Sequence, residues 1–253
     1  MQDRIQLLNT RVDNLTLQEA VDRIDQLAAS GHNAYVVTPN VDHIVHLESD
    51  ELFRKIYEDA ALVLTDGKPL IWISKWIKHP IKEKVSGSDL FPAVCEMAAK
   101  KGYRLVLFGA AEGVADQAAE RLTKKYPGLF VVGTYSPAYG FEKDAQELEK
   151  AYDFIRKTTP DILCVGLGSP KQEKFFYEAR AYVQVPVTLH IGAAIDFEAG
   201  KVKRAPIWMQ NAGLEWLYRL MKEPRRLFKR YIIDDMSIWK LYYKYKRKKG
   251  DKV

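Results

Sequence analysis

Short apolar runs alternate along the chain with longer stretches in which apolar residues recur every three or four positions. Runs of this length are typical of buried strands in a parallel sheet, and amphipathic stretches are typical of the helices that cover it. Strands are predicted at 34–38, 62–66, 103–108, 130–133, 161–166 and 187–192, and residues 5–12 predict a strand or a hairpin arm. Helices are predicted at 16–31, 41–47, 51–60, 70–76, 90–101, 113–126 and 144–157. This alternation predicts an α/β fold with a Rossmann-like, mostly parallel sheet.

After Arg204 the pattern changes to a long, basic, amphipathic segment. Its large apolar residues recur at helical spacing: Trp208, Leu214, Trp216, Leu217, Leu220, Met221, Tyr231, Ile232, Ile233, Met236, Ile238 and Trp239. Lys and Arg are interleaved with them and dominate the end of the chain. We therefore predict two parts, an α/β core at 1–199 and a basic C-terminal helical appendage at 200–253.

The net charge of +6 is divided unevenly between these two parts. Residues 200–253 hold 16 Lys and Arg and 5 Asp and Glu, a net charge of +11, which leaves −5 for residues 1–199. Such asymmetry indicates an anionic partner, which could be nucleic acid, anionic lipid or a diphosphate substrate. Basic helices with interleaved Trp and Tyr fit a membrane interface, and the plainer alternative is a solvated basic helix pair docked on the core. The two alternatives are compatible.

Composition bounds the class of protein further. A hydrophobic content of 47% and a charged content of 28% are those of a soluble globular chain, and no apolar run has the length of a bilayer span or a signal peptide. We expect a cytoplasmic protein whose contact with a membrane is peripheral. Cys95 and Cys164 fall in apolar segments and are expected to be reduced core residues. No spacing typical of metal ligands is present, so neither a metal nor another cofactor is indicated.

The clearest candidate for chemistry is Asp66, which ends the apolar run 62–65 and precedes a Gly-Lys-Pro turn. In open α/β sheets ligands bind at the carboxyl ends of the strands, so a carboxylate there is well placed for catalysis. Asp is also a good helix N-cap, and a helix is predicted to begin near Pro69. The residues alone leave the catalytic and the capping interpretations equal.

Polar residues follow other predicted strands as well. Thr38 and Asn40 end the strand at 34–38, although Asn40 taken alone is more typical of a helix cap. Lys84 opens a polar, glycine-containing loop at 84–89 that leads into the next predicted helix. If these turns lie at one edge of the sheet, their side chains form a site around Asp66.

Two glycine-containing turns are candidates for binding a nucleotide. Gly109 and Ala110 stand between a predicted strand and a helix, an arrangement that brings backbone N–H groups and the positive helix end to a diphosphate. The turn lacks the full G-x-G-x-x-G pattern, so simple close packing is the alternative. After the strand at 161–166, Gly168 permits close approach of a ligand, and Lys171 and Gln172 supply hydrogen-bond donors.

Taken in order, these turns resemble a known family. The matching segments are Thr-Pro-Asn at 38–40, Asp-Gly at 66–67, Gly-Ser-Asp-Leu at 87–90, Gly-Ser-Pro-Lys-Gln-Glu at 168–173, Gly-Ala at 192–193, Asp-Phe-Glu-Ala-Gly at 196–200, Arg-Ala-Pro at 204–206, and the segments 213–220 and 223–227. Each motif alone is weak, but the ordered set is specific. It resembles the WecG/TagA/CpsF glycosyltransferases, family 26 of that enzyme class, from about residue 4 to about residue 235.

The resemblance implies an inverting, metal-independent transferase with a Rossmann-like core and a C-terminal helical appendage that completes the active site at the membrane. It implies transfer of a sugar from a UDP-sugar to a polyprenyl-diphosphate-linked acceptor at the inner face of a bacterial membrane. In the teichoic-acid branch of the family the donor is UDP-N-acetylmannosamine, and the acceptor is undecaprenyl-diphosphate N-acetylglucosamine.

The resemblance also implies roles for individual residues. Asp66 matches the family's proposed general base, which takes the proton of the acceptor hydroxyl. Thr38 and Asn40 match a substrate-binding pair, and Gln172 matches a further residue of the pocket. A guanidinium binds phosphate in a bidentate way, which makes the arginines of the appendage candidates for a diphosphate. These candidates are Arg219, Arg225 and Arg226.

Two departures from the family pattern leave the donor sugar open. Lys84 stands where the family commonly has an active-site Arg, and Lys68-Pro69 replaces the usual continuation after Asp66-Gly67. A UDP-glucose-type hexosyltransferase of exopolysaccharide synthesis is the nearest alternative. A non-enzymatic nucleotide-binding scaffold is another, although no nucleic-acid recognition motif is present, and a nicotinamide-dependent oxidoreductase is a weaker third. The appendage could dock on its own core, or the uncovered core could form a homo-oligomer.

Overall fold

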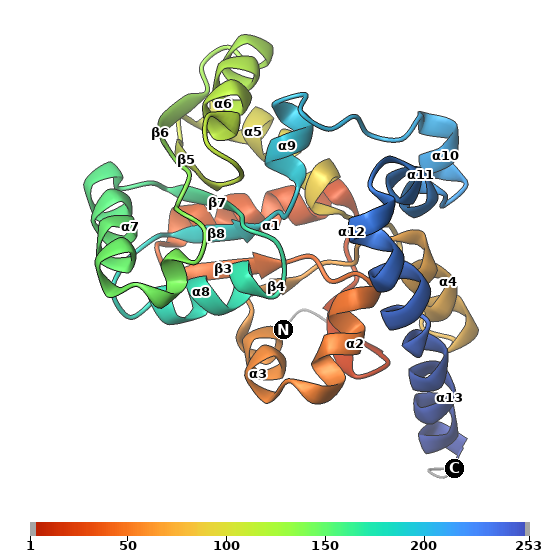
Figure 1. Cartoon of the computed structure of the whole chain (residues 1–253). Coiled ribbons are helices and arrows are strands. Elements are labelled where there is room, and N and C mark those ends of the chain that lie inside the picture. The colour runs from red at the N-terminus through yellow and green to blue at the C-terminus, as the bar shows by residue number, and fades with distance from the viewer. Residues whose placement is uncertain (1–3, 251–253) are drawn as a thin grey trace.

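The computed structural model describes residues 4–250, apart from the side chains of Arg226 and of residues 248–250. Its centre is a six-stranded parallel sheet with the strand order β4-β3-β8-β7-β5-β6. The strands are β3 (Ala34–Val37), β4 (Leu62–Val63), β5 (Arg104–Gly109), β6 (Phe130–Tyr135), β7 (Ile162–Gly166) and β8 (Val187–His190). Helices cover both faces (Figure 1), so the predicted Rossmann-like α/β core is confirmed.

Each face of the sheet has its own apolar core, because successive residues of a strand point to opposite faces. In β5, Val106 and Phe108 enter one core, and Leu105 and Leu107 enter the other. The first core is covered by α2 (Val41–Ser49), α3 (Glu51–Asp59), α4 (Lys68–Trp76), η1 (Phe141–Lys143), α7 (Ala145–Thr158) and α8 (Lys171–Ala179). The second is covered by α1 (Leu17–Ser30), α5 (Gly87–Lys101), α6 (Val114–Lys125) and α9 (Ala194–Glu198). Burial on both faces explains the continuous apolar runs of the strands.

Helix starts follow the capping residues. The predicted capping box at the start of α1 is present: Thr16 accepts a hydrogen bond from the Glu19 N–H, and the Glu19 carboxylate accepts one from the Thr16 N–H at 2.7 Å. The helix predicted from residue 90 begins earlier, at Gly87, because Ser86 Oγ accepts a hydrogen bond from the Asp89 N–H at 3.2 Å. This earlier start places Asp89 in the first turn of α5.

The N-terminal segment and β4 both differ from the predicted strands. The segment 5–12, predicted as one strand or one hairpin arm, instead forms both arms of a separate antiparallel hairpin, β1 (Arg4–Leu7) and β2 (Thr10–Asp13). β4 is shorter than the predicted strand, which extends to Asp66. Beyond Val63 the backbone still follows β3, since the Asp66 N–H donates to the carbonyl oxygen of Pro39 at 2.8 Å. Pro39 has no N–H to return, which ends the ladder and releases Asp66 into a loop.

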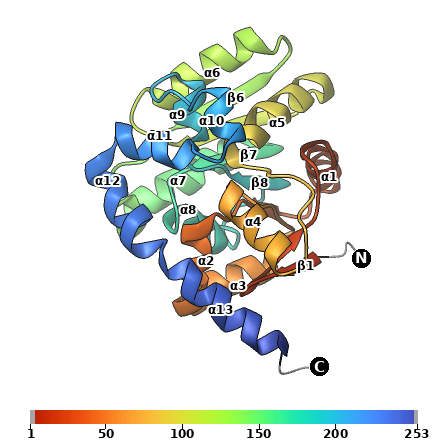
Figure 2. The same ribbon diagram turned by 90° about the vertical axis from the view of Figure 1, so that its right-hand side faces the viewer.

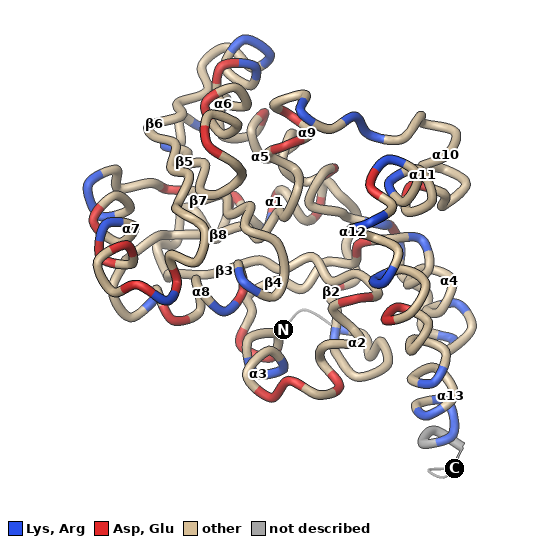
Figure 3. Tube along the Cα trace, in the orientation of Figure 1, with Lys and Arg blue, Asp and Glu red and all other residues tan. Residues whose placement is uncertain are grey.

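The C-terminal appendage is a chain of short helices: α10 (Ile207–Asn211), α11 (Glu215–Lys222), α12 (Pro224–Phe228), the π-helical η2 (Lys229–Asp234) and α13 (Ser237–Gly250). It runs along one side of the core and ends with α13 beside α2 (Figures 1 and 2). Ile238, Leu241 and Tyr242 of α13 are buried in the core that α2 and α4 cover. The apolar face of the appendage therefore docks on its own chain, and Lys and Arg remain along α13 (Figure 3). Among residues 4–250 there is no helix whose length and hydropathy would allow it to cross a bilayer.

The two cysteines are structural. Cys95 and Cys164 are free and fully buried, as predicted. Burial raises the pKa of both thiols, so both carry their protons and are poor nucleophiles.

Candidate active site

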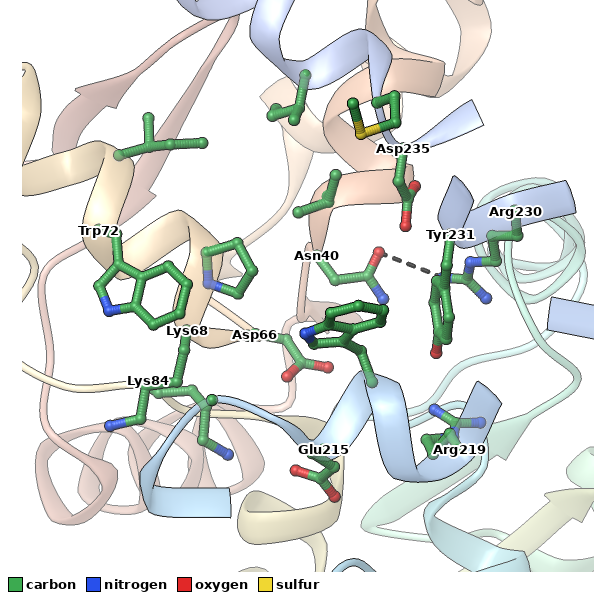
Figure 4. A pocket seen from close by; sticks show the side chains of 18 of the residues that line it. Asn40, Asp66, Lys68, Trp72, Lys84, Glu215, Arg219, Arg230, Tyr231 and Asp235 are labelled. Atoms are coloured by element: carbon green, nitrogen blue, oxygen red, sulfur yellow. Dashed lines mark hydrogen bonds between the residues drawn. The ribbon is translucent and has the colours of Figure 1, made fainter. Parts of the chain in front are cut away.

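A pocket lies between α4 and the appendage, at the carboxyl ends of β3 and β4 (Figure 4). Its volume is about 380 Å³, which suits part of a small organic ligand. Its polar and charged lining includes Asn40, Asp66, Lys68, Lys84, Glu215, Arg219, Arg230, Tyr231 and Asp235, and its apolar lining includes Trp72, Ile73, Trp76, Trp216, Ile232, Met236 and Trp239. Because α/β folds bind ligands at this edge of the sheet, the pocket is the candidate active site.

Asp66 lies half-buried in the middle of this pocket (Figure 4). α4 begins after Gly67, whose φ of 92° suits glycine, and no side chain caps this helix, so the capping interpretation of Asp66 is wrong. In the described part of the chain its carboxylate has no hydrogen-bond or ion-pair partner. Burial raises the pKa of Asp66; the charge of Lys84 opposes this shift, and the charges of Glu215 and Asp89 reinforce it. A carboxylate with a raised pKa binds a proton readily, as a general base must.

Lys84 lines the same pocket and belongs to an ion-pair network. Its ammonium pairs with Asp89 and lies 3.2 Å from Ser86 Oγ. Arg204 joins the network, with Nη1 2.9 Å from Asp89 Oδ1 and Nε 3.4 Å from Glu215 Oε1. Burial alone would raise the pKa of Asp89, but Lys84, Ser86 and Arg204 hold it below its ordinary value. Arg204 was not among the predicted site residues, and its only signal in the sequence is the Arg-Ala-Pro motif.

Asn40 caps α2 and faces the pocket at the same time. Its Oδ1 accepts a hydrogen bond from the His43 N–H at 3.4 Å, so the predicted cap is confirmed. The same oxygen lies 2.7 Å from Nδ1 of the His43 ring, whose Nε2 is 3.6 Å from the buried carboxylate of Glu173. Burial would raise the pKa of Glu173, but His43 and a hydrogen bond from Gln172 hold it below its ordinary value. The buried residues Glu173 and His43 thus orient the pocket amide from behind.

Gln172 and Thr38 lie behind the pocket and not on its lining. Gln172 is buried, where its Nε2 donates to Glu173 Oε1 at 2.8 Å and its Oε1 accepts from the Gly192 N–H at 3.2 Å. Thr38 Oγ1 donates to the carbonyl oxygen of His190 at 3.3 Å. Burial lowers the pKa of His190 to about 4, so this histidine is neutral. These bonds join the ends of β3, β7 and β8, and a direct substrate contact of Thr38 or Gln172 stays a prediction.

Two arginines of the appendage line the pocket. Arg219, which was predicted, comes from α11 and lies over the ring of Phe197, 5.7 Å from its centroid. Arg230 comes from η2 and was not predicted; its Nη2 is 3.1 Å from Asp42 Oδ2 and 3.4 Å from Asn40 Oδ1. The Nε of each guanidinium is buried without a hydrogen-bond partner in the described chain. Each arginine therefore keeps a donor for an anionic ligand.

Asp235 is a second acid–base group of the pocket and lies near Arg230 (Figure 4). Burial raises the pKa of Asp235 to about 7, and the charge of Asp42 adds to this effect while that of Arg230 opposes it. Its Oδ1 is buried and has no partner among residues 4–250. A carboxyl group in this state exchanges a proton near neutral pH.

The predicted nucleotide-binding turns lie at the carboxyl ends of β5 and β7, outside the pocket lining. Gly109 has a φ of 114°, and a Cβ at this position would lie 2.5 Å from the carbonyl oxygen of Gly166. The Ala110 N–H donates to that same oxygen at 2.9 Å. Close packing of β5 on β7 therefore requires glycine at 109. Gly168 has a φ of 76°, a conformation that favours glycine. Binding of a nucleotide at these two turns stays a prediction.

The remaining predicted residues are also absent from the pocket lining. Lys171 Nζ lies 3.1 Å from Glu142 Oε1. Arg225 is exposed on α12, and the side chain of Arg226 lies outside the described residues. Within the described range no cluster of three or more His, Cys, Asp and Glu side chains is arranged to hold a metal ion.

Known proteins resemble this chain over most of its length. The profile of the Glycosyl transferase WecG/TagA/CpsF family matches residues 5–252. An N-acetylglucosaminyldiphosphoundecaprenol N-acetyl-beta-D-mannosaminyltransferase of Bacillus spizizenii is 33% identical over 193 residues, which cover 76% of this chain and 73% of the relative. A protein of the same name in Bacillus subtilis is 30% identical over the same shares. One from Staphylococcus aureus is 24% identical over 226 residues, 88% of this chain and 87% of the relative.

Proposed function

Because this chain belongs to the WecG/TagA/CpsF family of glycosyltransferases, we propose that it transfers a sugar from a UDP-sugar to a sugar linked through a diphosphate to a polyprenol. The observation that carries the proposal is Asp66, an unpartnered carboxylate with a raised pKa in a pocket lined by two arginines. The relatives are named for transfer of N-acetylmannosamine to N-acetylglucosaminyldiphosphoundecaprenol. We propose the same class of acceptor here, in cell-surface polysaccharide or teichoic acid synthesis, with an N-acetylhexosamine or a hexose as the transferred sugar.

In this proposal Asp66 acts as the general base. Its carboxylate takes the proton of the acceptor hydroxyl while the hydroxyl oxygen attacks the anomeric carbon of the donor. The bond from that carbon to UDP breaks, and its electron pair leaves with the diphosphate. Attack opposite the leaving group inverts the anomeric centre, and no covalent intermediate with the enzyme forms.

Fixed positive charges balance the diphosphates of donor and acceptor. Arg219 and Arg230 line the pocket with free Nε donors, and Lys84 supplies a further charge. Cations held in place in a partly dehydrated site stabilise charge that develops on a leaving group, without a metal ion in this proposal. Arg225 of α12 is proposed to contribute from outside the pocket, at the inner face of the cell membrane, and Arg226 stays a predicted ligand of a diphosphate.

The sugar is the open part of this proposal, because Lys84 and the segment 68–69 depart from the family pattern. In the structure the ammonium of Lys84 pairs with Asp89, and unlike a guanidinium it cannot bind a ligand through two parallel hydrogen bonds. A UDP-glucose-type hexosyl donor is therefore tested beside UDP-N-acetylmannosamine.

The test is an assay of the purified protein with a polyprenyl-diphosphate N-acetylglucosamine acceptor and a panel of UDP-sugars. UDP release gives the rate, mass spectrometry identifies the product, and a reaction without acceptor corrects for hydrolysis. We expect one donor to be strongly preferred and the rate to persist in a chelating buffer. No UDP release with any donor would contradict the proposed function.

A further inference from the structure

The pocket has an apolar half that the chemistry proposed at Asp66 does not use. We call it the apolar arm; it is lined by Trp72, Ile73 and Trp76 of α4 and by Ile232, Met236 and Trp239 of the appendage. In Figure 4, Trp72 lies on one side of Asp66 together with Lys68 and Lys84, and the two pocket arginines lie on the other. Arg230 and Ile232 come from the same segment, η2, and both line the pocket, so the apolar arm also borders the arginine side.

Contacts between α4 and the appendage build the apolar arm. The indole of Trp76 stacks on that of Trp239, with ring centroids 5.8 Å apart and an angle of 26° between the planes. Farther toward the start of α4, Trp72 packs against Gly213, where a Cβ would lie 3.0 Å from the indole ring. The appendage therefore contacts α4 at two places, with α10 and α11 on one side of it and α13 on the other (Figure 2).

The arm is open to solvent although it is apolar. Trp76 is 49% exposed, Met236 is 56% exposed and Ile232 is 41% exposed. A contiguous exposed apolar surface beside a pocket marks a ligand site, because water at such a surface is unfavourable. Indole and aliphatic side chains offer few hydrogen-bonding groups, so a sugar or a nucleobase would leave its polar atoms unpaired there. The arm suits a hydrocarbon.

We propose that the apolar arm binds the first isoprene units of the acceptor's polyprenyl chain, a role that rests on the proposed function. Such an acceptor is amphipathic, with a sugar, then a diphosphate, then a hydrocarbon chain. The pocket offers matching groups: Asp66 for the sugar hydroxyl, Arg219 and Arg230 for the diphosphate, and indoles for the hydrocarbon. Binding the hydrocarbon next to the diphosphate fixes the position of the sugar hydroxyl at Asp66, while the bilayer holds the rest of the chain.

Two acceptors that differ only in their lipid test the proposal. Each carries N-acetylglucosamine diphosphate, linked in one to a farnesyl group and in the other to a methyl group. Both are assayed without vesicles or detergent, below the concentration at which the farnesyl compound aggregates. For the unaltered protein we expect the KM for the farnesyl acceptor to be roughly tenfold or more below that for the methyl acceptor, because burial of several methylenes easily exceeds the free energy of a tenfold change.

Variants then locate the effect. In the double variant Trp76→Ser/Trp239→Ser we expect the ratio of the two KM values to fall to about one. Trp208→Ser is the matched control, since Trp208 is an exposed tryptophan of the same appendage outside the pocket lining, and it should keep the ratio. Met236→Gln changes a more exposed residue of the arm and should lower the ratio several-fold. If circular dichroism shows that the double variant does not fold, Met236→Gln takes its place as the test of the apolar arm.

A binding assay separates this proposal from the proposed function. Four of the five tryptophans line the pocket, so their emission should shift when farnesyl diphosphate is added and not when inorganic pyrophosphate is added. If no transfer occurs with any donor but this shift is seen and is lost in Trp76→Ser/Trp239→Ser, the proposed function fails and the apolar arm stands. Equal KM values for the two acceptors in the unaltered protein would overturn the apolar arm alone. A double variant that keeps the farnesyl preference would also overturn the apolar arm. If that variant keeps the preference and loses only its binding to anionic vesicles, the indoles anchor the protein to the membrane instead.

Discussion

Asp66 combines a catalytic position with a thermodynamic cost. Burial raises its pKa, so the folded protein binds its proton more tightly than the unfolded chain does. The cost is absent below the ordinary pKa of an aspartate, because the group is then protonated in both states. The cost develops as the pH rises from the ordinary pKa to the raised pKa. Above the raised pKa the folded state carries a poorly solvated charge. At neutral pH Asp66 therefore lowers the free energy of unfolding.

We expect Asp66→Asn to lower kcat by about 100-fold or more at neutral pH and to raise the melting temperature at the same pH. The loss of rate follows from the missing base, and the gain in stability follows from the removal of a partly buried charge at nearly constant volume. For the unaltered enzyme, kcat/KM should fall as the pH drops through the raised pKa of Asp66. Rates of UDP release across pH and calorimetry of both proteins measure these effects.

Asp22→Asn is the matched control for this prediction, because Asp22 is exposed on α1, on the opposite face of the sheet from α4. It should leave both the rate and the melting temperature unchanged. A near-normal rate for Asp66→Asn would exclude Asp66 as the base. A lowered melting temperature at neutral pH would show that the carboxylate is stabilised in the folded state, against the burial argument.

Individual residues also show which parts of a site can be predicted from a sequence. Asp66 was found because strand ends are local features, and its role as a cap was excluded only by the conformation of Gly67. Arg230 was missed because it reaches Asn40 only after the π-helical turn η2 brings the appendage over α2. No periodicity within the appendage encodes that contact. Gln172 was predicted as a site residue, but its side chain lies behind the pocket.

At the scale of elements, the turn after β5 shows how packing and ligand binding can leave the same signal in a sequence. A small residue at this point can admit a diphosphate or a neighbouring strand. In the structure a Cβ on Gly109 would lie 2.5 Å from the carbonyl oxygen of Gly166 in β7. Gly113, four residues later, also has a positive φ, but a Cβ there would meet nothing within 4 Å. Comparing the two glycines therefore distinguishes the cost of a positive φ from the cost of a steric clash with a neighbouring strand.

We expect Gly109→Ala to lower the free energy of unfolding by roughly 2–4 kcal/mol or to prevent folding, because the new methyl group collides with backbone. Gly113→Ala should cost only about 1–2 kcal/mol, the penalty of a positive φ for alanine. Urea denaturation of both variants measures the difference, and calorimetric titration with UDP follows nucleotide binding. Equal losses of stability would contradict the packing argument. A stable Gly109→Ala that no longer binds UDP would instead favour the nucleotide role.

Element boundaries were predictable where the capping residues are local and unpredictable where a neighbouring strand decides. The capping box of α1 was read directly from Thr16 and Glu19. β4 was expected to reach Asp66, yet its ladder ends at Val63 because its partner continues into Pro39, which has no N–H. The length of β4 therefore depends on a residue more than twenty positions away in the sequence.

At the scale of the whole molecule, the appendage closes one side of the active site. Its basic, aromatic character was predictable from composition, and so was an apolar docking face. Its docking place was not, because the contacts of Trp239 with Trp76 and of Arg230 with Asp42 join residues distant in the sequence. Docking also leaves the Lys and Arg of α13 along one edge of the molecule (Figure 3). Lys244 is engaged there with Glu48 of α2, whereas Lys240, Lys246 and Arg247 are exposed.

This distribution predicts peripheral binding to anionic membranes through α13. We expect the protein to sediment with vesicles that contain phosphatidylglycerol and not with neutral vesicles, and the binding to weaken as salt is added. Replacing Lys240, Lys246 and Arg247 by Gln should weaken it about 100-fold, since each basic residue at such a surface contributes about 1 kcal/mol. A control with Lys100, Lys124 and Lys157 replaced by Gln has the same net charge, but these residues are exposed on α5, α6 and α7 in the α/β core. If the control loses as much binding as the α13 variant, net charge and not α13 holds the protein to the membrane. If the unaltered protein does not bind anionic vesicles, the acceptor must reach the pocket without help from the lipid surface.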